Sequence, residues 1–474
     1  MSSSVPQCGG CGRQGGAPGD QLDSTMNKSA DQDAPEQVFD WLQYESFAYF
    51  LNETNLDNGL VRDKNAPDWP ASIAAVGLAL SAYPVAVERG LIARAAAAAR
   101  VLTTLRFFWR SEQSSAIDAS GHHGFYYHFL DMQSGRRAGK CELSTIDTAL
   151  LLAGALMAAA YFDAAEAPEQ EIVELADALY RRADWQWALD GGDTVSLGWT
   201  PEKGFLPYRW QGYNEALLLY VLALGSPTHG LGRRHYDAWC AAYEWRRSYQ
   251  IDYLYCSALF THQLPHVWID FRAIQDDYMR AKDSDYFENS RRATLVQQRY
   301  AIENPHGYAG YGETCWGITA SDGPGPGTRV IDGVKRRFYD YVARGVPDGP
   351  DDGTIAPWAV IASLPFAPEI VMPTIAYLRH QPDLKCRYGF KTTFNMTYPG
   401  NAEHPQGWMS PWHFGIDQGP IMLMVENHRS GMPWRLMRGC SYIADGLRLA
   451  GFGGGWLDAA VPCAPSTSLQ ARTP

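Results

Sequence analysis

Three acidic residues stand where apolar helices are expected to begin. Glu142 lies two residues before Ser144 in CELSTIDTALLLAGAL, Glu215 follows Asn214 in NEALLLYVLALG, and Asp417 opens DQGPIMLMVENHR. Acids near a helix N-terminus are stabilised by the helix dipole by about 0.3–1 kcal/mol each, which is a purely structural role. Paired carboxylates also hydrolyse glycosides: one donates a proton to the leaving oxygen, and the other activates water or attacks the anomeric carbon.

The surroundings of these acids separate the two interpretations. Asp147 follows Ser144 at capping-box spacing, so we interpret it as an acid stabilised by the helix end. Glu142 lies outside the first turn, where that explanation is weaker. The loop before Glu215 is rich in aromatic residues, namely Phe205, Tyr208, Trp210 and Tyr213. Desolvation among aromatic rings would raise the pKa of Glu215 and suit a proton donor, whereas the helix dipole would lower that pKa.

Most of the chain has helical spacing of apolar residues. Helices are expected in the segments 35–52, 71–90, 91–109, 145–161, 169–189, 214–225, 233–249, 285–302, 356–366, 368–380 and 417–429. Strand alternation is scarce, and the segment 194–210 is expected to form small hairpins in a connecting loop. The fold class is therefore expected to be all-α.

The expected helices are of two kinds. Some are apolar almost all round, such as ALLLAGALMAAA and ALLLYVLAL, whereas EQEIVELADALYRRAD carries a polar stripe. Inner helices covered on all sides and outer helices facing water produce this contrast. It favours an α/α toroid of helical hairpins, with a multi-layer helical bundle as the alternative. If the inner helices all begin on one face, Glu142, Glu215 and Asp417 ring one cavity.

The composition limits the kinds of molecule that this protein is expected to bind. The 474 residues carry a net charge of −12 without a Lys/Arg run, which argues against a nucleic-acid partner. The 16 Trp, 26 Tyr and 18 Phe offer flat apolar faces that suit sugar rings as well as a core. No apolar stretch approaches the roughly 18–20 residues of a membrane span. Nothing in the sequence indicates an oligomeric state.

The expected organisation is one domain between two tails. We expect a disordered tail over residues 1–34, a single catalytic domain over 35–458 and a C-terminal tail over 459–474. The N-terminal segment lacks a basic region followed by an apolar one, so a cytoplasmic location is expected, or a periplasmic one if the true start differs. Nine cysteines, an odd number, suit reduced thiols, and the Cys8/Cys11 pair is interpreted as incidental.

One histidine-rich segment could suggest a metal site. His262, His266 and Asp270 lie close together in FTHQLPHVWIDFR, but the HExxH pattern is absent. Hydrogen-bonded structural histidines are the favoured interpretation, and neither a metal nor any other cofactor is expected.

Seven segments in order carry a resemblance to a known family. They are CELSTIDTALLLAGAL, GYNEALLLYVLALGSPTH, FTHQLPHVWIDFR, DYFENSRRATLVQQRYAI, WGITASDGPG, YGFKTTFN and GIDQGPIMLMVENHRSG. Over about residues 37–455 the chain resembles the bacterial glucoamylase-like family. That family includes endo-β-1,2-glucanases of glycoside hydrolase family 144, and the chain is also similar to the glucan-processing domain of cyclic β-1,2-glucan synthases.

The resemblance implies an (α/α)6 toroid that acts on glucan without a metal. It places the family's acids at Glu142 and Glu215, with Glu215 the better general acid. It also implies cleft residues that contact the substrate, namely Trp316, Asp322, Trp412 and Asp417, and the aromatic loop adds Trp210 and Tyr213. Asn214 departs mildly from the family, in which Ser often precedes the second Glu.

The expected function is hydrolysis of a β-glucan, with endo action on a β-1,2-linked glucan as the favoured interpretation. The nearest rival is a transglycosylase that uses the same residues. A non-catalytic carbohydrate-binding toroid is a rival from another class, because a fold does not determine a function. A polysaccharide lyase is more remote, because the net negative charge does not favour an acidic sugar.

Overall fold

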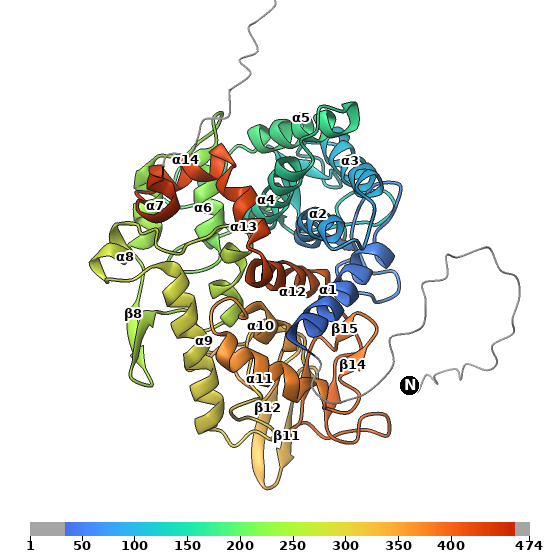
Figure 1. The fold of residues 1–474 in the computed structure, drawn as a ribbon, viewed down its shortest axis with the longest axis vertical. Helices are drawn as coiled ribbons and strands as arrows, with labels where there is room; N and C mark the ends of the chain where they lie inside the picture. Colours follow the sequence, from blue (N-terminus) through green and yellow to red (C-terminus); the bar gives the residue numbers. More distant parts are fainter. Residues whose placement is uncertain (1–33, 460–474) are drawn as a thin grey trace, which may run out of the picture.

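The structure, a computed structural model, describes residues 34–459 and is rich in helices (Figure 1). The predicted tails and the Cys8/Cys11 pair lie outside these residues, apart from the positions at their inner edges. The longer helices are α1 Pro35–Asn52, α2 Ile73–Glu88, α3 Arg94–Arg110, α4 Thr145–Tyr161, α5 Ala167–Arg182, α6 Ala216–Gly225, α9 Tyr286–Glu303, α11 Pro368–Arg379 and α12 Gly415–Arg429. Shorter ones are α7 Arg233–Cys240, α8 Asp277–Ala281, α10 Pro357–Ala362, α13 Met432–Arg438, α14 Ser441–Leu449 and α15 Gly455–Asp458.

The two predicted kinds of helix are present. Every residue of α2 from Ile73 to Ala86 is buried, whereas the buried residues of α5 form one stripe. Helix α2 packs between α4 and α12, α4 also packs against α6, and α12 against α10. Figure 1 shows these helices in the middle of the molecule, with α1, α3, α5, α9 and α11 outside them. The apolar helices thus form the interior, as their composition predicts.

Two glycines allow the central helices to approach closely. A Cβ atom on Gly77 of α2 would lie 2.3 Å from the Leu150 carbonyl oxygen, and one on Gly154 of α4 would lie 2.0 Å from the Gly77 carbonyl oxygen. No side chain fits at either position without moving the backbone, so glycine sets the spacing between α2 and α4.

Strands are short and lie in the connections between helices. A five-stranded antiparallel sheet has the order β2-β3-β5-β6-β7, with β2 Gly121–His122, β3 Phe125–Tyr127, β5 Leu143–Ser144, β6 Gly198–Thr200 and β7 Gly204–Phe205. The last two strands are the hairpin predicted within 194–210. The other pairs are β1 Ala71–Ser72 with β4 Phe129–Leu130, β8 Trp245–Ser248 with β9 Ile251–Leu254, β10 Ala320–Ser321 with β13 Val342–Ala343, β11 Gly327–Ile331 with β12 Val334–Phe338, β14 Lys385–Cys386 with β15 Gly389–Phe390, and β16 Phe394–Asn395 with β17 Trp408–Met409.

Two predicted helices end early: the segment 169–189 is α-helical only as far as Arg182, and the segment 233–249 is wrong in its second half. The segment 233–249 is helical only as far as Cys240, and Trp245–Ser248 forms strand β8. Ser248 pairs with Ile251 across Tyr249 and Gln250, which both have positive φ angles, 51° and 65°. Two consecutive residues with positive φ make the tight turn whose twist matches a hairpin, and the first strand of this hairpin replaces the second half of the predicted helix.

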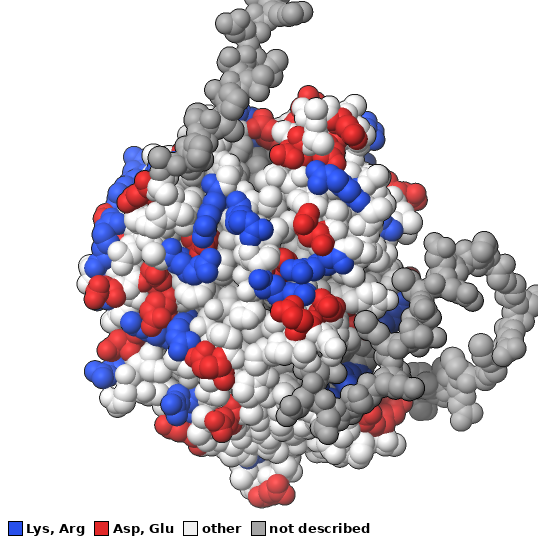
Figure 2. Space-filling model, in the orientation of Figure 1, with Lys and Arg blue, Asp and Glu red and all other residues white. Residues whose placement is uncertain are grey.

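The surface charge is mixed, and the length and composition of the helices bear on whether they could cross a membrane. On the face that Figure 2 displays, Lys and Arg side chains are interspersed with Asp and Glu. Over residues 34–459, no helix has both the length and the apolar composition needed to cross a membrane.

Candidate active site

His128 lies between the first residues of two central helices. It connects β3 to β4, its backbone N–H donates to the Glu142 carbonyl (2.9 Å), and its carbonyl accepts from the backbone N–H of Ile73 (3.3 Å). Because Ile73 begins α2 and Glu142 precedes the strand that leads into α4, this short sheet segment brings both helix N-termini to one imidazole.

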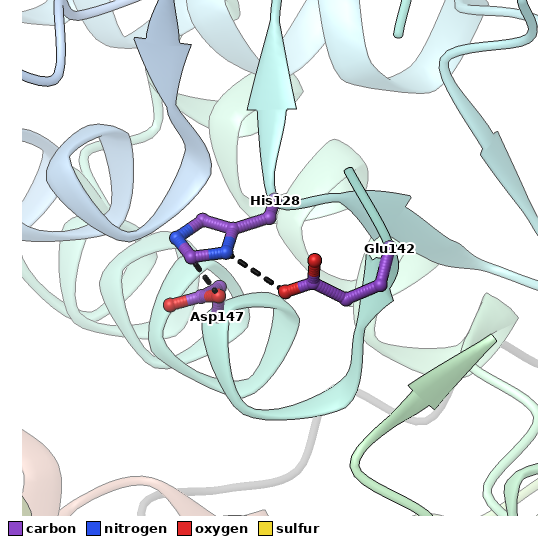
Figure 3. A group of neighbouring side chains, drawn as sticks. All are labelled: His128, Glu142 and Asp147. Atoms are coloured by element: carbon purple, nitrogen blue, oxygen red, sulfur yellow. Dashed lines mark hydrogen bonds and ion pairs between the residues drawn. The ribbon is translucent and has the colours of Figure 1, made fainter. Parts of the chain in front are cut away.

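The imidazole of His128 faces two carboxylates (Figure 3). Its Nδ1 lies 2.9 Å from Glu142 Oε1, and its Nε2 lies 3.6 Å from Asp147 Oδ2. The side chains of His128 and Glu142 are 32% and 33% exposed, so solutes reach them. Burial lowers the pKa of His128, but the charges of Asp147 and Glu142 outweigh it and raise that pKa to about 9. The ring is therefore an imidazolium at neutral pH.

The imidazolium determines the state of Glu142. Burial raises the pKa of this carboxyl group, but the hydrogen bond and the charge of His128 more than offset it, and the net pKa lies below its ordinary value. Glu142 is consequently ionised at neutral pH. An ionised carboxylate accepts protons or attacks carbon, and it does not donate.

Asp147 has more than the helix-end role assigned to it from the sequence. Ser144 Oγ does accept from the Asp147 backbone N–H (3.2 Å), which confirms the predicted N-cap of α4. The Asp147 carboxylate, however, turns to His128, and only 9% of the side chain is exposed. The interpretation from sequence was thus incomplete, because the partner of Asp147 comes from the connection between β3 and β4.

Glu215 is in the opposite state from Glu142. It immediately precedes α6 and is half-buried, and Asn214 Oδ1 accepts from the backbone N–H of Ala216 (3.0 Å) in its place. Burial raises the pKa of Glu215 to about 7, and the nearby charge of Asp147 adds to the increase. Desolvation therefore outweighs the helix dipole, and a large fraction of Glu215 carries a proton at neutral pH.

A second set of acids surrounds the first turn of α12. Asp417 is buried, and burial together with the charges of Asp63 and Asp322 raises its pKa well above the ordinary value. Asp322 accepts a hydrogen bond from Ser410 Oγ (2.7 Å). Asp63 also acts electrostatically on His128, and its backbone carbonyl accepts from the Gly415 N–H (2.8 Å). Asp63 therefore links this set to the His128 group.

Tyr341 lies within reach of both sets. It is 54% exposed, and the charges of Asp417, Asp63, Asp147 and Asp322 act on its phenol. Glu142, Glu215 and Asp417 are connected only through intermediate charges: His128 acts on Glu142, Asp147 on Glu215 and Asp63 on Asp417.

Exposed aromatic rings adjoin the acids. Trp69 is 39% exposed, and its indole N–H donates to Asp63 Oδ2 (3.0 Å). The Lys64 ammonium lies 3.8 Å from the Trp69 ring centroid and 5.7 Å from that of Trp412, which is half-exposed. Trp210 is half-buried and donates to Thr145 Oγ1 (3.0 Å) at the start of α4. Rings held in this way offer flat faces to a sugar.

Two predicted contact residues lie elsewhere. Trp316 is completely buried, and its indole N–H donates to Thr374 Oγ1 of α11 (2.9 Å). It presents no surface to a substrate, so the prediction for Trp316 is wrong. Tyr213 is 5% exposed and packs its ring against Tyr243 and Tyr286. Tyr213 therefore packs inside the protein, two residues before Glu215, and offers almost no ring surface to a sugar.

One group of side chains has the spacing of a metal site, namely His128, Glu142 and Asp147. Their donor atoms all lie within 4.8 Å of one another. Each ring nitrogen faces a different carboxylate, Nδ1 toward Glu142 and Nε2 toward Asp147, so we interpret the group as an ion-pair network. His262 and His266 are buried and bonded to the Cys256 carbonyl (3.1 Å) and Ser290 Oγ (2.9 Å), in agreement with structural roles.

Sequence reasoning missed several residues of this site. His128, Asp63, Lys64 and Trp69 lie in short segments between helices, where no apolar periodicity draws attention to them. The one available signal was DKNAPDW, a polar connection that combines an acid, a cation and a tryptophan.

Comparisons with known proteins find similarity to proteins named as glucoamylases and β-1,2-glucan hydrolases. Residues 207–441 match a family described as "Putative glucoamylase". An exo β-1,2-glucooligosaccharide sophorohydrolase (non-reducing end) from Parabacteroides distasonis is 27% identical over 450 residues, which are 87% of this chain and 57% of that protein. The chain therefore spans just over half the length of this curated relative.

Solved structures agree with the sequence matches. A "putative glucoamylase" from Bacteroides uniformis is 29% identical with a TM-score of 0.80, covering 90% of this chain and all of that one. A β-1,2-glucanase from Parabacteroides distasonis is 25% identical with a TM-score of 0.78, covering 90% of this chain and 61% of that one. The resemblance to the glucoamylase-like family, expected from seven sequence segments, is confirmed in both sequence and fold.

Proposed function

We propose that this protein is a glycoside hydrolase that cleaves β-1,2-linked glucan. The observation that carries the proposal is a pair of carboxylic acids with opposite pKa shifts, Glu215 raised to about 7 and Glu142 lowered. When the surroundings of two carboxyl groups shift their pKa values in opposite directions, one group can serve as the acid and the other as the base. The linkage is supported by the relatives named for β-1,2-glucan.

Glu215 acts as the proton donor in this proposal. Its protonated carboxyl group transfers a proton to the glycosidic oxygen as the bond to the anomeric carbon breaks. Glu142, kept ionised by His128, is the partner carboxylate. In either form of glycoside hydrolysis this partner must carry a charge, whether it removes a proton from water or attacks the anomeric carbon itself.

The remaining site residues bind the glucan. Trp210, Trp412 and Trp69 are proposed to stack against glucosyl rings, because part of each ring is exposed beside the acids. Asp322 and Asp417 are proposed to hydrogen-bond the sugar hydroxyl groups. The raised pKa of Asp417 favours a neutral carboxyl group that can donate as well as accept.

We also propose that the helices form an (α/α)6 toroid within a single catalytic domain, residues 35–458. The order α12–α2–α4–α6 of neighbouring apolar helices, each covered by more polar ones, supports this arrangement. The acids at the starts of α4, α6 and α12 then share one end of the ring.

The test is hydrolysis of a panel of linear glucans that differ in linkage, followed by NMR. We expect cleavage of the β-1,2-linked member. Glu215→Gln should reduce turnover by about 10²–10⁴-fold, the usual contribution of a general acid, with an unchanged melting temperature. Glu174→Gln, on the exposed face of α5, is the matched control. Near-normal turnover of Glu215→Gln would remove this residue from the mechanism.

Further comparisons within the same assay separate the alternatives. Glu142→Gln should lose far more turnover than Asp417→Asn, and the reverse order would make Asp417 the base. Product length distinguishes endo cleavage, which the sequence motifs favour, from release of short units at one end. Linkage products formed with an added acceptor sugar would indicate a transglycosylase, and binding of β-1,2-glucan without cleavage would indicate a binding protein.

A further inference from the structure

We propose that His128 is a positioning residue whose imidazolium holds Glu142 and Asp147 in place and thereby couples the two carboxylates of the proposed reaction. The inference rests on the proposed function for its catalytic consequence, but the ion-pair network itself is testable without a substrate.

The backbone and the ring of His128 are both held in place. The backbone N–H and carbonyl bond to Glu142 and Ile73, and the ring stacks on Phe129 with centroids 4.0 Å apart and planes at 14°. Each nitrogen then faces a carboxylate oxygen, Nδ1 at 2.9 Å and Nε2 at 3.6 Å. Only the imidazolium carries a hydrogen on both nitrogens, so the geometry is that of a charged ring between two anions.

The groups around this ring are acidic. Glu142 faces it from the segment before β5, Asp147 from the first turn of α4, and Asp63 from the connection between α1 and β1. The charge of Arg137 also acts on Glu142, the charge of Asp147 acts on Glu215, and the charge of Glu215 acts on the Cys256 thiol. The imidazolium is thus the positive charge in direct contact with both Glu142 and Asp147.

Loss of this charge should affect both proposed catalytic acids in the same direction. Glu142 would lose its hydrogen-bonded counter-ion, so it would ionise only at higher pH. The charge of Asp147 would no longer be balanced, so it would act more strongly on Glu215, which would hold its proton to higher pH. Both limbs of the pH profile should therefore shift upward.

The test is the variant His128→Gln, which keeps one N–H donor and removes the charge. The acidic limb of kcat/KM should rise by about 1 pH unit or more, the effect of losing an opposite charge at this distance, and the basic limb should rise as well. His229→Gln is the matched control, because His229 pairs with Asp184 at 3.7 Å beyond the far end of α6 and should leave the profile unchanged.

A second measurement does not depend on activity. NMR titration of the wild-type protein, with the His128 signal assigned by its absence in the variant, should find the ring still protonated at pH 8. Titration at or below about 6.5, the ordinary histidine value, would overturn the inference. The inference would also be overturned if the wild-type protein cleaves glucan and His128→Gln leaves both limbs of the kcat/KM pH profile at their wild-type positions. Failure of wild type to cleave any glucan would instead refute the proposed function, while the titration still decides the ion pairing.

Discussion

A buried ion pair beside the candidate site allows a quantitative test of the structure. Arg344 and Asp352 have completely buried side chains, joined by Nε to Oδ1 (2.8 Å) and Nη2 to Oδ2 (2.9 Å). The guanidinium also donates to the carbonyls of Ser321 (2.5 Å) and Tyr339 (3.0 Å). Ser321 immediately precedes Asp322, and Tyr339 lies two residues before Tyr341. Arg344 therefore holds two segments that carry residues of the candidate site.

The variant Arg344→Met leaves the Asp352 carboxylate buried without its counter-ion. The remaining donors to that carboxylate include the backbone N–H groups of Tyr339 (2.9 Å) and Thr354 (3.2 Å), which do not replace a full charge. Breaking one side of a buried pair costs about 3–5 kcal/mol. The entropy of unfolding of a chain of 474 residues is about 1 kcal/mol per kelvin, so the melting temperature should fall by about 3–5 °C.

Thermal unfolding followed by circular dichroism measures this loss. The double variant Arg344→Met/Asp352→Asn removes the stranded charge and keeps an oxygen acceptor, so it should recover part of the lost stability. Arg448→Met is the control, because Arg448 and Asp445 are 48% and 61% exposed and such pairs contribute below about 1 kcal/mol. Equal losses for Arg344→Met and Arg448→Met, or no recovery in the double variant, would refute the reasoning.

Two further predictions concern pH and packing. Because Glu215 must be protonated and Glu142 ionised, kcat/KM on β-1,2-glucan should fall about tenfold per pH unit above about pH 7. The acidic limb should lie below the ordinary titration range of a glutamate, because the pKa of Glu142 is lowered; a plateau that persists to pH 9 would contradict the assignment. Gly154→Ala should destabilise the fold by about 1–3 kcal/mol in chemical denaturation, because its Cβ would overlap the Gly77 carbonyl. Gly232→Ala, with nothing within 4 Å, should not.

Much of the architecture follows from local pattern. The helices around Leu150 and Leu219 are apolar on every side, and that property alone assigns them to the interior. The acids at their starts were also visible, because Asn214 and Ser144 mark the N-termini. The net direction of the Glu215 pKa stayed open at that level, because desolvation by the preceding aromatic residues and the helix dipole act in opposite directions.

Contacts between distant segments were invisible to the same reasoning. Asp147 has the spacing of a helix cap, and nothing in its neighbourhood predicts that His128 lies 3.6 Å away. Trp316 sits in a glycine-rich segment typical of a binding loop, yet its indole is inside the core against α11. Strand β8, which follows Cys240, depends on a turn at Tyr249 and Gln250 with positive φ angles. Neither residue is a glycine, so no signal in the sequence predicts this turn.

The identity of the acids and the burial of their helices are properties of the chain itself, because periodicity and capping act over a few residues. The protonation states of Glu142 and Glu215 are not, because they depend on charges that approach through space. A single imidazole, held in the short connection between β3 and β4 beside the starts of α2 and α4, lowers the pKa of the Glu142 carboxyl group, while burial raises that of Glu215.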